Sequence, residues 1–174
     1  LLERVLSDIE TPRGAPPGDA CAFASGVAVA AAVFQALPGG HVVLADDVYH
    51  GNRSLLMQVF EDWGLRWTMV DMTDLEAVER ALGDARAAQR TRADRREGGV
   101  DDENVVVWTE TPSNPLLKVT DIRAIAAICA KVGRTSKVPL IVDATWCTPW
   151  ICQPLGLGAD LVVHSTTKYF GGHS

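Results

Sequence analysis

Residues 159–174, "ADLVVHSTTKYFGGHS", pass from a short apolar run directly into hydroxyls, a lysine and glycines. The apolar run is typical of a buried strand. Most strands end in ordinary turn residues, whereas this one ends in Ser, two Thr and Lys. Hydroxyls beside an amine can hold a phosphate next to a nucleophilic nitrogen. The segment therefore predicts a strand whose carboxyl end carries chemistry.

Three other segments share this pattern of about four apolar residues followed by polar ones: "HVVLADD" (41–47), "NVVVWTE" (104–110) and "PLIVDAT" (139–145). Such runs are typical of parallel strands that are buried on both faces. Apolar residues at helical spacing lie between the runs, in residues 24–37, 52–64, 73–85 and 120–133. Two of these helical segments open with Thr-Asp, which can cap a helix. The alternation predicts an α/β fold with a mostly parallel sheet and helices on both faces.

Composition limits the classes of function. The chain has 174 residues, of which 47% are hydrophobic and 22% are charged, enough for one domain with a core. A net charge of -6 argues against nucleic acid as the main partner, because phosphate backbones attract basic surfaces. No apolar run approaches the roughly 20 residues that span a bilayer. The four cysteines form no C-x-x-C pair, so we expect no disulfide framework and a reducing cytoplasm or organelle interior.

One segment, about residues 85–104, departs from the alternating pattern. It is rich in arginines, acidic residues and glycines, and it offers little to bury. We expect the end of a solvated helix followed by an exposed insertion.

Ligands of open α/β sheets bind beyond the carboxyl ends of the strands. The candidate residues at these ends are Asp47, Tyr49, Glu110, Asn114, Asp143, Ser165, Thr167 and Lys168. Together they offer what pyridoxal 5'-phosphate (PLP) requires: Lys168 for the aldehyde and Asp143 for the pyridine nitrogen. Its phosphate favours a helix start, where Ser25 and Gly26 begin the segment "SGVAVAAAVFQAL".

Six ordered segments carry a resemblance to a known family: "FASG" (23–26), "DDVYHGN" (46–52), "ETPSNP" (110–115), "VDATWCTP" (142–149), "PLGLGAD" (154–160) and "HSTTKYFGGHS" (164–174). In order and spacing the sequence resembles the Cys/Met metabolism (transsulfuration) family of PLP-dependent enzymes. The resemblance implies the large PLP-binding domain of a fold-type I, aspartate aminotransferase-like enzyme.

The resemblance also implies residue roles. Lys168 would form the Schiff base and move protons at the substrate Cα, Asp143 would pair with the pyridine nitrogen, and Tyr49 would stack on the ring. These three are the expected catalytic residues. Asn114 would hydrogen-bond the ring hydroxyl. The phosphate would be held by Ser25, Gly26, the backbone N–H of Val27, Ser165 and Thr167.

Two residues depart from the family pattern. Val27 stands where Met or Leu is usual, and a backbone contact should survive that change. Ala144 replaces a usual Asn and removes a polar neighbour from Asp143. We expect Ala144 to affect the tuning of the site rather than its existence.

The resemblance implies an enzyme of methionine and cysteine metabolism, acting by β- or γ-elimination or γ-replacement on cystathionine or O-acylhomoserine-type substrates. Cystathionine γ-synthase or γ-lyase is the preferred activity, in a dimer of dimers. The family's N-terminal arm and smaller C-terminal domain are absent from these 174 residues, so we expect residues 1–174 to be a partial large domain that is inactive alone. A truncated, non-catalytic relative with a structural role is the alternative. We expect no metal site. A zinc site formed by His164, His173 and Asp143 is a weaker hypothesis.

Overall fold

The computed structural model describes residues 1–93, 104–133 and 137–171. These residues form a 5-stranded sheet in the order β2-β1-β3-β4-β5, with every neighbouring pair parallel. The strands are β1 (His41–Ala45), β2 (Arg66–Val70), β3 (Val105–Glu110), β4 (Leu140–Asp143) and β5 (Leu161–Val163). The helices are α1 (Leu2–Glu10), α2 (Gly26–Gln35), α3 (His50–Leu55), α4 (Leu75–Ala93), α5 (Ile122–Val132) and α6 (Thr148–Ile151). A π-helical stretch, η1 (Leu56–Phe60), continues α3, and a 3-10 turn, η2 (Pro154–Leu157), precedes β5.

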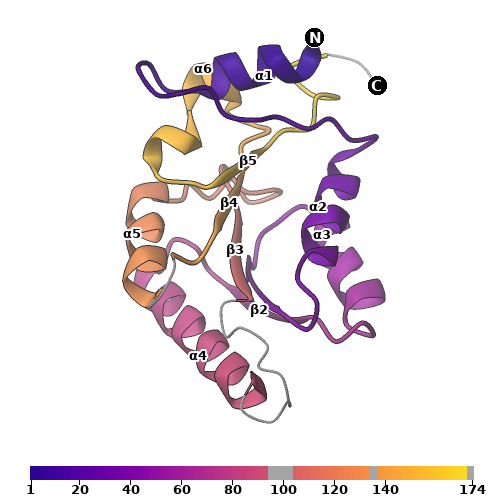
Figure 1. Ribbon diagram of the computed structural model, residues 1–174, viewed down its shortest axis with the longest axis vertical. Helices are drawn as coiled ribbons and strands as arrows, with labels where there is room; N and C mark the ends of the chain where they lie inside the picture. The colour runs from indigo at the N-terminus through magenta and orange to yellow at the C-terminus, as the bar shows by residue number, and fades with distance from the viewer. Residues whose placement is uncertain (94–103, 134–136, 172–174) are drawn as a thin grey trace.

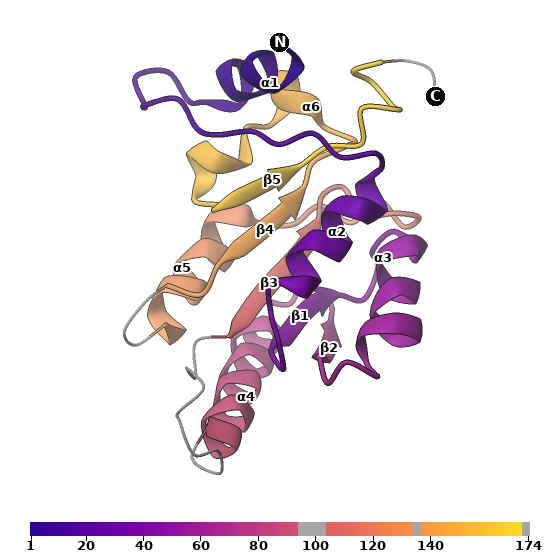
Figure 2. The same ribbon diagram turned by 45° about the vertical axis from the view of Figure 1, so that its right-hand side comes forward.

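Helices cover both faces of the sheet, which confirms the predicted α/β architecture. Figures 1 and 2 show α2 and α3 on one face and α4 and α5 on the other. The chain leaves β1 toward the face of α3, but it leaves the neighbouring strand β3 toward the face of α5. The two connections diverge beyond the carboxyl ends of β1 and β3, where doubly wound sheets bind their ligands.

The core is centred on β1 and β3. All six residues of β3 are buried, as expected for a central strand with helices on both faces. Trp108 is fully buried, and its ring lies 5.8 Å from the ring of Phe34 in α2. This packing holds α2 against the sheet.

The four predicted strands are confirmed, but the prediction missed β2. This strand, "RWTMV", lies at the edge of the sheet, and its first residue, Arg66, is exposed. An edge strand with one solvated side does not need the continuous apolar run that marks a central parallel strand. The run-based criterion therefore could not detect it.

The first part of residues 85–104 is the predicted helix end, but it is more buried than expected. Helix α4 continues to Ala93, and Ala85, Arg86 and Gln89 are all buried. The Gln89 amide donates a hydrogen bond to the backbone oxygen of Gly39, 3.1 Å away. Long polar side chains can thus cover the end of the sheet, which a charge count does not reveal. Residues 94–103 lie outside the described residues.

Cys21, Cys129, Cys147 and Cys152 are all free thiols. Within the described ranges, no helix is both long enough and apolar enough to cross a membrane.

The Thr-Asp pairs begin helices as predicted. Asp121 Oδ1 accepts a hydrogen bond from Ala124 N–H at 3.0 Å at the start of α5, and Asp74 Oδ1 accepts one from Ala77 N–H at 2.9 Å at the start of α4. Each carboxylate satisfies a backbone donor that the helix itself leaves unpaired.

Replacing Asp121 by Ala should therefore lower the free energy of unfolding of the intact protein by about 1 kcal/mol, because one N–H of α5 loses its acceptor. Denaturant titration followed by circular dichroism measures this change. Asp121→Asn is the matched control and should keep most of the stability, since its amide oxygen can still cap the helix. An Asn variant no more stable than the Ala variant would contradict the capping role.

Candidate cofactor site

Asp143 is the last residue of β4, at the carboxyl edge of the sheet. Its Oδ1 accepts hydrogen bonds from the backbone N–H and the hydroxyl of Thr145, at 3.0 and 2.6 Å. Burial raises the pKa of the Asp143 carboxyl, while the Thr145 hydrogen bonds and the nearby His164 ring oppose that rise. The hydrogen bonds described for the carboxylate all go to Oδ1. Oδ2 therefore remains able to pair with a cationic group at this edge.

The amino end of α2 forms the next part of the site. Ser25 caps the helix, because its Oγ accepts a hydrogen bond from Ala28 N–H at 3.1 Å. A Cβ placed on Gly26 would lie 4.0 Å from the Cβ of Ser165, so these two residues are neighbours. A helix start with a glycine and nearby hydroxyls is suited to an anion such as a phosphate.

Tyr49 and Val27 meet at Gly51. A Cβ on Gly51 would lie 2.6 Å from Tyr49 Cε1 and 3.0 Å from Val27 Cγ2. The tyrosine ring therefore occupies space that any other residue at position 51 would fill. Tyr49 is 47% exposed, so one part of the ring remains accessible beside the start of α2.

Lys168 lies in the turn that follows β5. Its backbone N–H donates to the oxygen of Ser165 at 3.1 Å, and Ser165 N–H donates in turn to Thr145 Oγ1 at 2.9 Å. Thr145 thus links the lysine turn to Asp143. Lys168 and Thr167 are both exposed, and the Lys168 amine has no ion-pair partner among the described residues.

Glu110, at the end of β3, connects Asp143 with Tyr49. It lies beside Asp143 in the register of β3 and β4. Its Oε2 accepts a hydrogen bond from Tyr49 N–H at 2.7 Å. Burial raises the pKa of Glu110 to about 8, with a further rise from the carboxylate of Asp143. The site therefore concentrates acidic groups at an edge where a cation would be stabilised.

Asn114 lies in the loop after β3 and is partly buried. The neighbouring Ser113 and Leu116 both donate hydrogen bonds to Asp47 Oδ2, the backbone N–H of Leu116 at 2.9 Å. Asp47 was expected at the strand end, and the structure shows that it holds the loop of Asn114.

His164 pairs with Glu10 of α1, through its Nε2 and Glu10 Oε1. Both side chains are almost fully buried, so the His164 ring is held against α1. His173, the other histidine of the weaker zinc reading, lies outside the described residues. No cluster of three potential metal ligands occurs in the part of the chain that the structure describes.

An apolar cavity of about 410 Å³ lies beside His164, between α1, residues 18–23, α2 and β5. None of the predicted site residues lines it. The candidate site is therefore the carboxyl edge of the sheet and not this cavity.

The structure brings most of the predicted residues into one connected arrangement. Contacts run from Gly26 to Ser165, from Ser165 through Thr145 to Asp143, and from Tyr49 to Glu110. The sequence reasoning missed Thr145 and Gly51. The position of Thr145 two residues after Asp143 is a usable signal, because such a residue can bond back to an aspartate. Ala144, the residue that departs from the family pattern, is fully buried and donates its N–H to Val163.

Comparisons with known proteins agree on one family. Residues 1–174 match the family described as Cys/Met metabolism PLP-dependent enzyme. The chain is 41% identical over 155 residues to a cystathionine gamma-synthase of Mycobacterium leprae, covering 88% of this chain and 34% of that protein. It is 41% identical over 175 residues to a cystathionine gamma-lyase of Bacillus subtilis, covering 99% and 39%.

A solved structure gives the same result for the fold. The cystathionine gamma-lyase from Lactobacillus plantarum, complexed with L-serine, has a TM-score of 0.78 and 34% sequence identity, covering 99% of this chain and 39% of that one. The chain thus spans between a third and two fifths of the length of these relatives. The match over residues 1–174 and these identities show that the chain belongs to the Cys/Met metabolism family of PLP-dependent enzymes.

Proposed function

We propose that the intact protein is a PLP-dependent enzyme of transsulfuration, and that residues 1–174 supply the central part of its cofactor domain. The observation that carries this proposal is the position of the Asp143 carboxyl group. It lies at the same edge as the helix start capped by Ser25 and the turn of Lys168. Burial raises the pKa of this carboxyl group. A cationic partner stabilises the ionised form of a buried carboxyl group. The protonated ring nitrogen of the cofactor is a partner of this kind.

The residues at this edge fit the group. Asp143 would hold the proton on the pyridine nitrogen, while Thr145 fixes the carboxylate through Oδ1. Gly26 and Ser165 are neighbours at the start of α2, where the phosphate would bind together with Ser25, Thr167 and the backbone N–H of Val27. When bound, the cofactor supplies an electron-withdrawing ring that stabilises negative charge on a substrate carbon.

The remaining roles fall to three side chains. Lys168 would carry the covalent link to the cofactor, and its freed amine would take the proton from the substrate Cα. Tyr49 would cover the ring face with its accessible side. Asn114 would hydrogen-bond the ring hydroxyl.

The relatives guide the choice of substrate. Two of them are named cystathionine gamma-synthase and gamma-lyase, each 41% identical to the chain, and a Lactococcus lactis relative at 39% is named cystathionine beta-lyase. These identities do not separate the three reactions. We propose cystathionine or O-acylhomoserine-type substrates, with γ-synthase or γ-lyase activity preferred, in a cytoplasmic dimer of dimers.

Asp143→Asn in the intact protein should keep some bound cofactor but lose most turnover, on the order of 100-fold, because an amide does not hold the ring proton electrostatically. Turnover of cystathionine and the absorbance of bound cofactor measure the two effects. Asp160→Asn is the matched control, since Asp160 lies in the loop before β5 and bonds Lys137. Near-normal turnover of the Asp143 variant would remove Asp143 from this role.

The raised pKa of Asp143 also predicts a pH dependence. An acid is neutral below its pKa, and a neutral carboxyl cannot pair with a cationic nitrogen, so cofactor retention should fall as the pH is lowered through the raised pKa of Asp143. Equilibrium dialysis of the intact protein over a series of decreasing pH values measures retention. Asp143→Asn should flatten this dependence; the same pH profile in both proteins would show that another group controls retention.

A further inference from the structure

The loops that carry Tyr49 and Asn114 begin side by side but lead to opposite faces of the sheet. They follow β1 and β3, which are hydrogen-bonded neighbours, yet the chain then turns toward opposite faces of the sheet. Two ring contacts from diverging loops need a connection that fixes their relative position.

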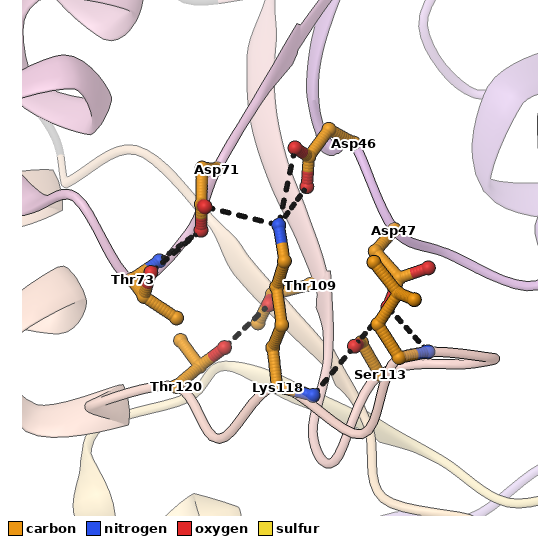
Figure 3. Close-up of polar contacts among 9 residues, drawn as sticks. Asp46, Asp47, Asp71, Thr73, Thr109, Ser113, Lys118 and Thr120 are labelled. Carbon is orange, nitrogen blue, oxygen red and sulfur yellow. Dashed lines mark hydrogen bonds and ion pairs between the residues drawn. The ribbon is translucent and has the colours of Figure 1, made fainter.

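Asp47 provides one half of such a connection. It lies two residues before Tyr49, but its Oδ2 accepts a hydrogen bond from the Ser113 hydroxyl (Figure 3). The same oxygen accepts one from Leu116 N–H at 2.9 Å, so Asp47 bonds residues on either side of Asn114. Ser113 Oγ in turn accepts from Lys118 N–H at 2.9 Å. Asp47 is 7% exposed and Ser113 is 3% exposed, so water hardly competes for these bonds.

Glu110 provides the other half in the opposite direction. It belongs to β3, the strand that leads into the Asn114 loop, and it accepts the backbone N–H of Tyr49 at 2.7 Å. The loop of Asn114 is thus held by the Asp47 side chain, which follows β1, and the loop of Tyr49 is held by the Glu110 carboxyl group, which ends β3.

Lys118 connects the loop after β3 to the ends of β1 and β2. Its ammonium contacts Asp46 after β1 at 3.2 Å and Asp71 after β2 at 2.9 Å (Figure 3). Hydrogen bonds from Thr73, and then from Lys118, lower the pKa of Asp71 to about 2, which keeps it charged. These groups are partly exposed, so Lys118 braces the loop from the surface, while Asp47 acts from inside.

We propose that Asp47 and Glu110 are positioning residues that set Asn114 and Tyr49 relative to each other, so that both contact one cofactor ring. Asp47 acts through Asn114, and Glu110 acts through the backbone of Tyr49. This inference rests on the proposed function, because it assigns both residues to the same ring. The two side chains would then determine how the cofactor ring is contacted, in addition to stabilising the loops.

The test is a double-mutant cycle in the intact holoenzyme, with PLP itself as the probe. Asp47→Ala should weaken PLP binding roughly tenfold, as expected when a buried charged acceptor is lost, and should shift the absorbance of bound PLP in the same direction as Asn114→Ala. In the Asn114→Ala background, Asp47→Ala should weaken PLP binding by less than about twofold, because the side chain through which Asp47 acts is gone. Ser113→Ala, which removes only one hydroxyl, should show the same coupling even where Asp47→Ala folds poorly.

The controls separate positioning from general stability. Asp46 lies one residue away, and the hydrogen bonds described for its side chain go to Lys118 at the surface, so Asp46→Asn should change PLP affinity less than about twofold. Glu110→Gln retains an acceptor for Tyr49 N–H and should bind PLP better than Glu110→Ala. Fully multiplicative effects of Asp47→Ala and Asn114→Ala, with no shared spectral shift, would overturn the positioning role while leaving the proposed function intact. An intact protein that binds no PLP would overturn both.

Discussion

Parallel pairing of the strands is the constraint on which the site depends. Because the strands run in one direction, the ends of β1, β3, β4 and β5 all lie at one edge of the sheet. Residues as distant in sequence as Tyr49 and Asp143 are thereby brought to a common edge without any long loop. The buried packing of Trp108 against Phe34 then holds α2 against the same sheet.

The acidic groups at this edge explain why it suits a cationic ring. Burial raises the pKa of both Glu110 and Asp143, and the two carboxyl groups lie side by side on adjacent strands. Such groups oppose each other's ionisation unless a positive charge or a hydrogen-bond donor is present. Thr145 and Tyr49 N–H supply donors from the chain. The ring nitrogen of a bound cofactor would supply the positive charge.

The sequence predicted the parts of this arrangement that depend on local patterns. Apolar runs identified four strands, Ser25 and Gly26 were expected at a helix start, and the Thr-Asp pair at Asp121 was expected to cap a helix. Strand β2 was missed because an edge strand such as Arg66–Val70 lacks such a run. The buried Arg86 and Gln89 were missed because charge suggested exposure. The bonds of Asp47 to Leu116 and of Glu110 to Tyr49 join residues 69 and 61 positions apart, which no local pattern can reveal.

We propose that the turn after β5 brings a reactive amine, that of Lys168, to this edge. Borohydride reduction of the intact protein with PLP, followed by peptide mapping, tests it most directly. We expect the phosphopyridoxyl group on Lys168, because the Lys168 amine is exposed and has no ion-pair partner among the described residues, whereas the Lys118 amine is held by Asp46 and Asp71. The label should be absent from a Lys168→Ala variant. A label on Lys118, Lys131 or Lys137, or on no lysine, would contradict the assignment of this strand end as the catalytic centre.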